Sequence, residues 1–132
     1  MLKDLSHTRL KELVNIANVL RFRVVKMSSK AKSAHLGSCL SCMDILVALY
    51  FDILNLDASK PKDDTRDIFI MSKGHAAMSL YAVLSERGFF DKGTLEKFNI
   101  DGSLLAEHPP AKGNPGVEAA TGSLGHGLPI AA

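Results

Sequence analysis

Four of the five histidines in this chain of 132 residues lie within two residues of a glycine or a proline. They are His35 in SAHLGS, His75 in SKGHAAM, His108 in AEHPP and His126 in SLGHGL. A histidine on a tight turn presents its imidazole without a long flexible arm, and near neutral pH it donates, accepts or carries a proton. The pattern predicts several loops that converge on one polar ligand. The alternative for each histidine alone is a solvated loop or a satisfied core position.

Five glycines crowd the segment GNPGVEAATGSLGHG, residues 113–127. Such density lets backbone N–H and C=O groups approach a ligand closely, so that they do the recognising in place of side chains. The spacing is neither the GxGxxG of a dinucleotide-binding loop nor the Gly-Lys-Ser/Thr of a phosphate-binding loop. By spacing alone, the segment is also compatible with a surface loop rich in turn residues.

The only two cysteines, Cys39 and Cys42, form the motif CLSC. A pair at this spacing occurs in redox dithiols and in halves of zinc sites. The chain has no second cysteine pair, and the segment reads as the first turn of a helix. Packing of small side chains is therefore the favoured interpretation, a redox role stays open, and we assign no metal ligands.

The elements that must position these residues are mostly helices. Apolar residues recur at three- and four-residue steps from Asp4 to Met27 and from Ser41 to Ile53, which predicts two amphipathic helices. A third helix is expected after Gly74, ending at Arg87-Gly88. A short helix is predicted at Thr94–Phe98, and residues 128–132 read as the opening turn of one more.

A single buried strand is predicted at Asp67–Ser72, directly before the Lys-Gly-His of SKGHAAM. His75 would then lie at a strand-to-helix turn, where the backbone donors of a helix N-terminus attract phosphate and other anions. One strand cannot form a sheet. We therefore expect an incomplete α/β unit whose last element is interrupted at residue 132.

Composition and charge exclude several classes of function. The chain is 46% hydrophobic and 23% charged with a formal net charge of +2, which is ordinary for a globular domain. Basic and acidic residues are interspersed, so nucleic-acid binding is not expected. No apolar run is long enough to cross a bilayer, and the N-terminus lacks the pattern of a secretory signal. We expect a cytoplasmic protein with no membrane partner.

Four segments follow one another along the chain: SAHLGSCLSCMDILVALYF, RDIFIMSKGHAAMSLYAVL, AEHPP and PGVEAATGSLGHGLPIA. In this order and at these separations they resemble the N-terminal region of the transketolases, and most of all the shorter, two-gene type. The resemblance implies an α/β thiamine diphosphate-binding fold, with a parallel sheet flanked by helices. Residues 1–132 would form a partial domain of this kind, apparently truncated.

The resemblance also implies roles for individual positions. His35 matches a family histidine near the reacting carbons of the substrate, where it binds hydroxyls and moves protons. His108 matches one that lines the substrate channel, and His75 matches one that contacts the phosphates of thiamine diphosphate. Positions in TGSLG match those whose backbone contacts the aminopyrimidine ring of the cofactor: Gly122, Ser123 and Leu124.

The implied reaction is transfer of a two-carbon ketol unit from a ketose phosphate to an aldose phosphate, for which the cofactor supplies the hard chemistry. The implied partners are sugar phosphates and the C-terminal transketolase section or subunit, in a homo- or hetero-oligomer. The family's Gly-Asp-Gly segment and later asparagine, which bind Mg²⁺ and the diphosphate, would lie beyond Ala132. The activating glutamate comes from another domain, so this chain alone is expected to be inactive.

Three positions depart from the family pattern. Ala34 stands where many members have glycine, which would tighten the first histidine loop if that glycine has a positive φ. His126 stands where glutamine is usual. Pro129 falls in the opening turn of the last helix, where proline is tolerated.

Two other functions compete with a transketolase section. One is a related thiamine-dependent synthase of the deoxyxylulose-phosphate synthase type, which shares the histidine and glycine loops. The other is a truncated, non-catalytic fragment that acts only through a partner. For such a fragment we expect exposed apolar faces around Leu46 and Leu80, and hence self-association.

Overall fold

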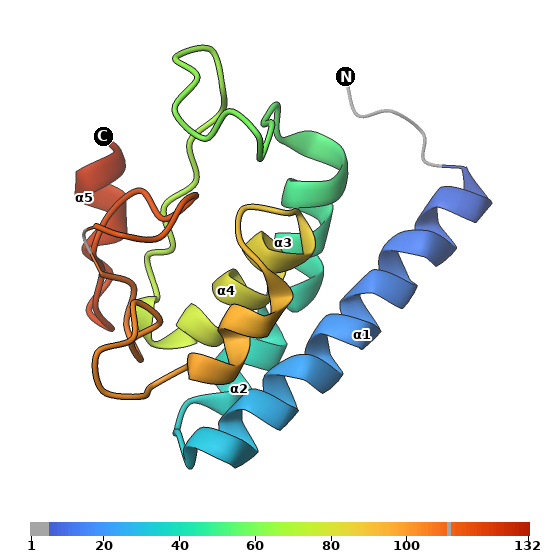
Figure 1. Ribbon diagram of the computed structural model, residues 1–132. Helices are drawn as coiled ribbons and strands as arrows, with labels where there is room; N and C mark the ends of the chain where they lie inside the picture. Colours follow the sequence, from blue (N-terminus) through green and yellow to red (C-terminus); the bar gives the residue numbers. More distant parts are fainter. Residues whose placement is uncertain (1–5, 111) are drawn as a thin grey trace.

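A computed structural model describes residues 6–110 and 112–132 of the chain (Figure 1). The helices of the first hundred residues pack together on one side, and irregular segments with the short C-terminal helix lie on the other (Figure 1). In chain order the helical elements are α1 (His7–Ala31), α2 (Leu36–Ser41), α3 (Met43–Ala48), the π-helical turn η1 (Leu49–Ile53), the 3₁₀ turn η2 (Gly74–Ala76), α4 (Ala77–Glu86), the 3₁₀ turn η3 (Lys92–Lys97) and α5 (Gly127–Ala131).

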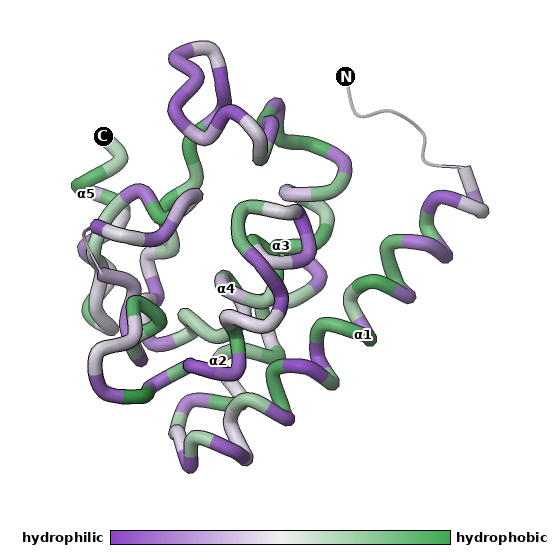
Figure 2. The backbone as a smooth tube through the Cα atoms, viewed as in Figure 1, coloured by the Kyte–Doolittle hydropathy of each residue, from purple (hydrophilic) through white to green (hydrophobic). Residues whose placement is uncertain are grey.

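Helix α1 begins where the Ser6 hydroxyl accepts a hydrogen bond from the Arg9 amide at 3.2 Å. It ends where Lys32 turns left-handed, with φ 52°. This confirms the first predicted helix and moves its end from Met27 to Ala31, while its predicted start at Asp4 lies outside the described residues. Green and purple alternate along the helix (Figure 2). Its buried apolar stripe consists of Leu13, Ala17, Leu20, Val24 and Met27.

The stripe of α1 covers α3 and α4. Leu46 on α3 is 1% exposed and Leu80 on α4 is 3% exposed. The prediction of an exposed apolar face was therefore wrong around Leu80, where α1 packs over α4. On α3 only part of it holds, because Ile45 is 63% exposed beside the buried Leu46. The helix predicted at Ser41–Ile53 is confirmed as α3 continued by η1, and it begins at Met43.

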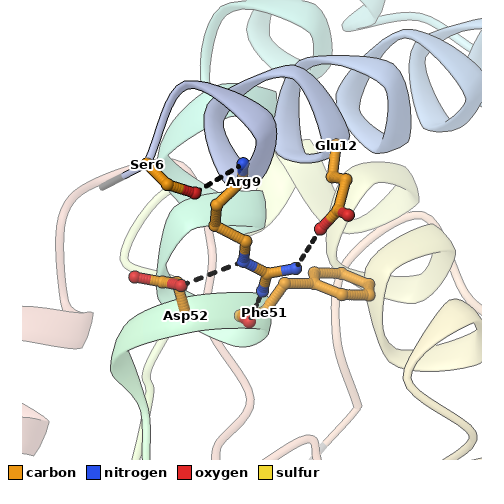
Figure 3. Close-up of polar contacts among 5 residues, drawn as sticks. All are labelled: Ser6, Arg9, Glu12, Phe51 and Asp52. Carbon is orange, nitrogen blue, oxygen red and sulfur yellow. Dashed lines mark hydrogen bonds and ion pairs between the residues drawn. The ribbon is translucent and has the colours of Figure 1, made fainter.

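Arg9 fastens the start of α1 to η1 (Figure 3). Its guanidinium donates to the Asp52 carboxylate at 3.2 Å, to Glu12 at 3.1 Å and to the Phe51 carbonyl. A planar fork with several donors suits such divided binding. The contact joins residues far apart in the sequence, so α1 and the α3–η1 pair form one platform.

The strand predicted at Asp67–Ser72 does not form. No residue in the described ranges belongs to a β-strand, and Ile68 is 64% exposed. A ladder needs a neighbouring strand whose N–H and C=O groups pair with its own. None of the described segments supplies one, so the parallel sheet of the predicted α/β fold is not present in this part of the chain.

The remaining elements follow the prediction closely. The short helix expected at Thr94–Phe98 is the 3₁₀ turn η3, and the last predicted turn is α5. Residues 101–126 contain no helix in the part that the structure describes. A search of the described helices finds none with the length and hydropathy of a membrane span.

Truncating Leu20, which is fully buried, should cost much of the fold's stability. Leu20→Ala leaves a cavity among α1, α3 and α4, and should lower the free energy of unfolding by about 2–5 kcal/mol. Urea unfolding followed by circular dichroism measures this. The matched control is Leu10→Ala on the same helix, where the side chain is 50% exposed and the loss should be about 0.5 kcal/mol. Equal losses would contradict this placement of the core.

Candidate functional site

Three of the four singled-out histidines lie together. The His35 and His75 ring centroids are 5.2 Å apart, and those of His35 and His108 are 6.3 Å apart. They come from three different segments: the N-cap of α2, the turn η2 and the loop after η3. The fourth, His126, is exposed at the N-cap of α5, and within the described ranges no ring contact joins it to the others.

His35 has a left-handed backbone, with φ 67° and ψ 17°. This conformation is uncommon for a residue with a side chain. It turns the chain from the end of α1 into α2, a short helix that sequence reasoning missed. The positive φ belongs to His35 and to Lys32, whereas Ala34 has none. The alanine therefore does not strain the loop in the way that its difference from the family glycine suggested.

The His75 turn is packed against the glycine-rich segment. The Gly74 amide donates to the Gly122 carbonyl at 2.8 Å, and the Thr121 hydroxyl donates to the Met71 carbonyl at 2.6 Å. A Cβ added at Gly74 would lie 2.1 Å from the Thr121 carbonyl oxygen, far inside van der Waals contact. Position 74 therefore requires glycine. The glycine-rich segment 113–127, whose spacing was also compatible with a surface loop, therefore packs against the His75 turn at Thr121 and Gly122.

His75 has one ring nitrogen without a partner. Its Nδ1 atom is buried and makes no hydrogen bond to any described residue. Burial lowers the pKa of His75 because it disfavours the charged imidazolium, and the nearby His35, Lys73 and His108 lower it further. The neutral imidazole is therefore favoured, and its buried Nδ1 has no hydrogen-bond partner among the described residues.

The TGSLG backbone lies open beside this imidazole. Gly122 is half-buried, and a Cβ added to it would meet nothing within 4 Å. Ser123 is exposed, and the Leu124 side chain is 83% exposed. A glycine with open space above its backbone suits close approach by a ligand. No cluster of three metal-ligating side chains occurs among residues 6–110 and 112–132.

The two cysteines are free and buried, with Cys39 in α2 and Cys42 between α2 and α3. The Cys42 thiol donates to the Ser38 and Cys39 carbonyls, at 3.4 Å each. Burial raises the pKa of both thiols. A thiol with a raised pKa stays protonated, which is the less reactive form. The surroundings therefore favour packing over redox chemistry for this pair.

Three polar residues around the histidines were missed from the sequence, although each lies inside a quoted motif. Lys73 Nζ donates to the Ser38 carbonyl at 2.7 Å and to the Ser41 hydroxyl at 3.0 Å. The Ser33 hydroxyl donates to Glu107 Oε1 at 2.6 Å. A hydrogen bond between distant segments produces no recognisable pattern in the sequence. The one available signal was that Ser33, Lys73 and Glu107 lie within two residues of a singled-out histidine.

Comparison with known proteins identifies the family of the chain. Residues 12–132 match the family described as the transketolase thiamine diphosphate binding domain. A curated relative, one of the subunits of the apulose-4-phosphate transketolase of Phocaeicola vulgatus, is 44% identical over 110 residues. That alignment covers 83% of this chain and 39% of the relative, so the chain spans about two fifths of the relative's length.

Solved transketolases share the same arrangement of elements. The enzyme from Leishmania mexicana superposes with a TM-score of 0.82 at 30% identity, covering 88% of this chain and 18% of that one. The Pichia stipitis enzyme, in a complex with sedoheptulose 7-phosphate, gives a TM-score of 0.80 at 32% identity, covering 86% of this chain and 17% of that one. At these identities the likeness extends beyond the coarse fold.

Adding a methyl group at Gly74 should push the His75 turn away from the glycine-rich segment. We expect Gly74→Ala to lower the free energy of unfolding by about 1–3 kcal/mol, as overpacking does. It should also move the amide resonances of His75 and Gly122. The matched control is Gly37→Ala in α2, where a Cβ meets nothing within 4 Å. An unchanged spectrum for Gly74→Ala would contradict the close contact.

The pKa of His75 should lie below that of an ordinary histidine, because burial and the nearby His35, Lys73 and His108 oppose its protonation. The unfolded chain then takes up this proton more easily than the folded chain. The contribution of His75 to stability therefore falls as the pH drops below the ordinary histidine pKa. NMR titration of ring protons measures the midpoint, and the signal is assigned by its loss in His75→Gln. A midpoint above the ordinary value would contradict this electrostatic account.

Proposed function

The chain belongs to the transketolase thiamine diphosphate-binding domain family, and we propose that it supplies the N-terminal, diphosphate-binding section of a transketolase. The observation that carries the proposal is the buried, unpartnered Nδ1 of His75 beside the open Gly122 backbone. Most buried polar atoms in proteins are hydrogen-bonded, and contact with a ligand would account for this one. These residues fit a cofactor that carries phosphate oxygens next to a flat heterocycle.

In this proposal the cofactor is held by two segments that already contact one another. The His75 ring would bind a phosphate oxygen of thiamine diphosphate, and the backbone of Gly122, Ser123 and Leu124 would contact the aminopyrimidine. The exposed Leu124 side chain would be covered by the bound cofactor. When bound, thiamine diphosphate supplies the carbanion chemistry that a protein side chain cannot provide.

His35 and His108 would act on the substrate. Both rings belong to the histidine cluster, and His35 is exposed while His108 is half-buried. An imidazole there can bind a sugar hydroxyl and can accept or return its proton near neutral pH. We propose ketose and aldose phosphates as the substrates. The sugar phosphate in the Pichia stipitis complex supports that class.

Residues outside these 132 would complete the site. The described residues hold no cluster of metal ligands, and we propose that the ligands of a Mg²⁺ ion come from outside this segment. We also propose a partner section or subunit that completes the site in a homo- or hetero-oligomer. The Phocaeicola vulgatus relative is named as one of the subunits of its enzyme, which supports a separate partner chain.

Cofactor binding should depend on His75. Thiamine diphosphate and Mg²⁺ should raise the unfolding temperature of the purified chain. At a hundredfold excess of ligand over its dissociation constant, the free energy of unfolding should rise by about 2.7 kcal/mol. His75→Asn should lose most of this shift, because it removes the ring that faces the ligand. The control is His7→Asn at the exposed start of α1. An equal shift in the unaltered chain and in His75→Asn would refute this site.

Turnover should require the partner. The chain alone should show no ketol transfer from xylulose phosphate to ribose phosphate, and adding the rest of the diphosphate-binding domain together with the complementary pyrimidine-binding subunit should restore it. His35→Asn and His108→Asn should then lower the rate by about 10²–10⁴-fold, the usual contribution of proton transfer by a positioned side chain. Steady turnover by the chain alone would overturn the proposal. Reaction with pyruvate and glyceraldehyde phosphate instead would identify a synthase of the deoxyxylulose type.

A further inference from the structure

No shared backbone hydrogen bond joins the segments that carry the three histidines. His35 caps the six-residue helix α2, His75 lies in the three-residue turn η2, and His108 lies in an irregular loop. Within the described ranges, none of the backbone hydrogen bonds connects residues 33–41 with residues 72–76 or with residues 104–110. The distances between the rings must therefore be set by packing and by side-chain contacts.

Lys73 ties the far end of α2 to the His75 turn. Its ammonium donates to the Ser38 carbonyl at 2.7 Å and to the Ser41 hydroxyl at 3.0 Å. The last carbonyls of a helix have no partner within it, and a cation there is favoured by the helix dipole. Lys73 stands two residues before His75, so the contact holds the His75 turn against the helix that His35 begins.

Ser33 ties the near end of the same segment to the His108 loop. Its hydroxyl donates to Glu107 Oε1 at 2.6 Å, and both residues are half-buried. The Ser33 carbonyl accepts from the Ser28 hydroxyl on α1 at 3.0 Å. Glu107 directly precedes His108, so this contact joins the His35 and His108 segments and anchors both to the end of α1.

We propose that Lys73 and the Ser33–Glu107 pair are positioning residues that set the distances between the three imidazoles. They form a loop clamp, meaning the contacts of Lys73 with α2 and of Ser33 with Glu107. The clamp fastens the His35 segment at both ends, to the His75 turn at one and to the His108 loop at the other. The need for such spacing rests on the proposed function, whereas the clamp itself is a matter of geometry.

The loop clamp has an electrostatic side as well. The groups that face His75 are the rings of His35 and His108 and the Lys73 ammonium, and all three lower the pKa of His75. Removing the Lys73 charge, or letting the two rings move away, therefore raises that pKa. A merely structural residue elsewhere in the fold has no such effect.

The experiment uses NMR of the purified chain with isotope-labelled histidine and without cofactor. Ser33→Ala should weaken the ring-to-ring nuclear Overhauser contact of His35 with His108 and spare that of His35 with His75. The Tyr81 hydroxyl, which donates to the Ala106 carbonyl at 3.0 Å, still holds the His108 loop in this variant. Lys73→Met should weaken the His35–His75 contact and raise the titration midpoint of His75. The Ser79 hydroxyl, which donates to the Cys39 carbonyl at 2.8 Å, still joins α2 to α4 in this variant. Lys73→Arg keeps the charge and the donors, and should restore both.

Two exposed positions provide matched controls. Ser29→Ala, on α1, and Lys92→Met, whose ammonium pairs with Glu86 at 2.9 Å, should leave every ring contact and the His75 midpoint unchanged. Unchanged contacts in both Ser33→Ala and Lys73→Met would overturn the proposal. If Lys73→Met does not fold, Ser33→Ala decides alone, because it removes a single oxygen atom. No cofactor takes part, so a failure of the proposed function would leave this result standing.

Discussion

The site depends on one close approach between two backbones. Gly74 lies so near the Thr121 carbonyl that no side chain fits between them, and its amide bonds to Gly122. A second contact repeats the arrangement farther along, where a Cβ on Gly127 would lie 2.6 Å from the Ser72 Cα atom. Segments about fifty residues apart in the chain thus lock together through glycine. Without this contact the His75 ring and the TGSLG backbone would not share a site.

The packed helices α1, α3 and α4, with η1, support the segments that carry the site. The buried stripe of α1 covers α3 and α4, and Arg9 fixes its first turn to η1. The histidines themselves sit on irregular segments at the edge of this platform. Irregular segments on a rigid support are where binding and catalytic groups are commonly found. The hydrophobic core therefore sets where the loops begin and end, and polar contacts set where their side chains meet.

Sequence reasoning succeeded where the determining interactions are local. The apolar residues of α1 and of the 41–53 helix recur with helical period, because each turn of a helix bonds to the next. Each histidine or glycine motif is likewise confined to a short stretch of sequence. It failed for Asp67–Ser72, because a strand exists only with a neighbour. It missed α2, since six residues show too little of a period, and it missed Ser33 with Glu107, whose contact spans 74 residues.

The left-handed backbone of His35 limits which residues can stand there at all. Glycine adopts this conformation freely, while asparagine, aspartate and histidine tolerate it better than other residues, and β-branched side chains resist it strongly. A residue at position 35 must therefore meet two requirements. It must adopt the left-handed backbone, and it must supply the imidazole that the proposed function needs. An isoleucine or valine at this position would strain the turn through its β-branched side chain, in addition to removing the imidazole. Asparagine, which keeps the turn and removes the ring, separates the two requirements.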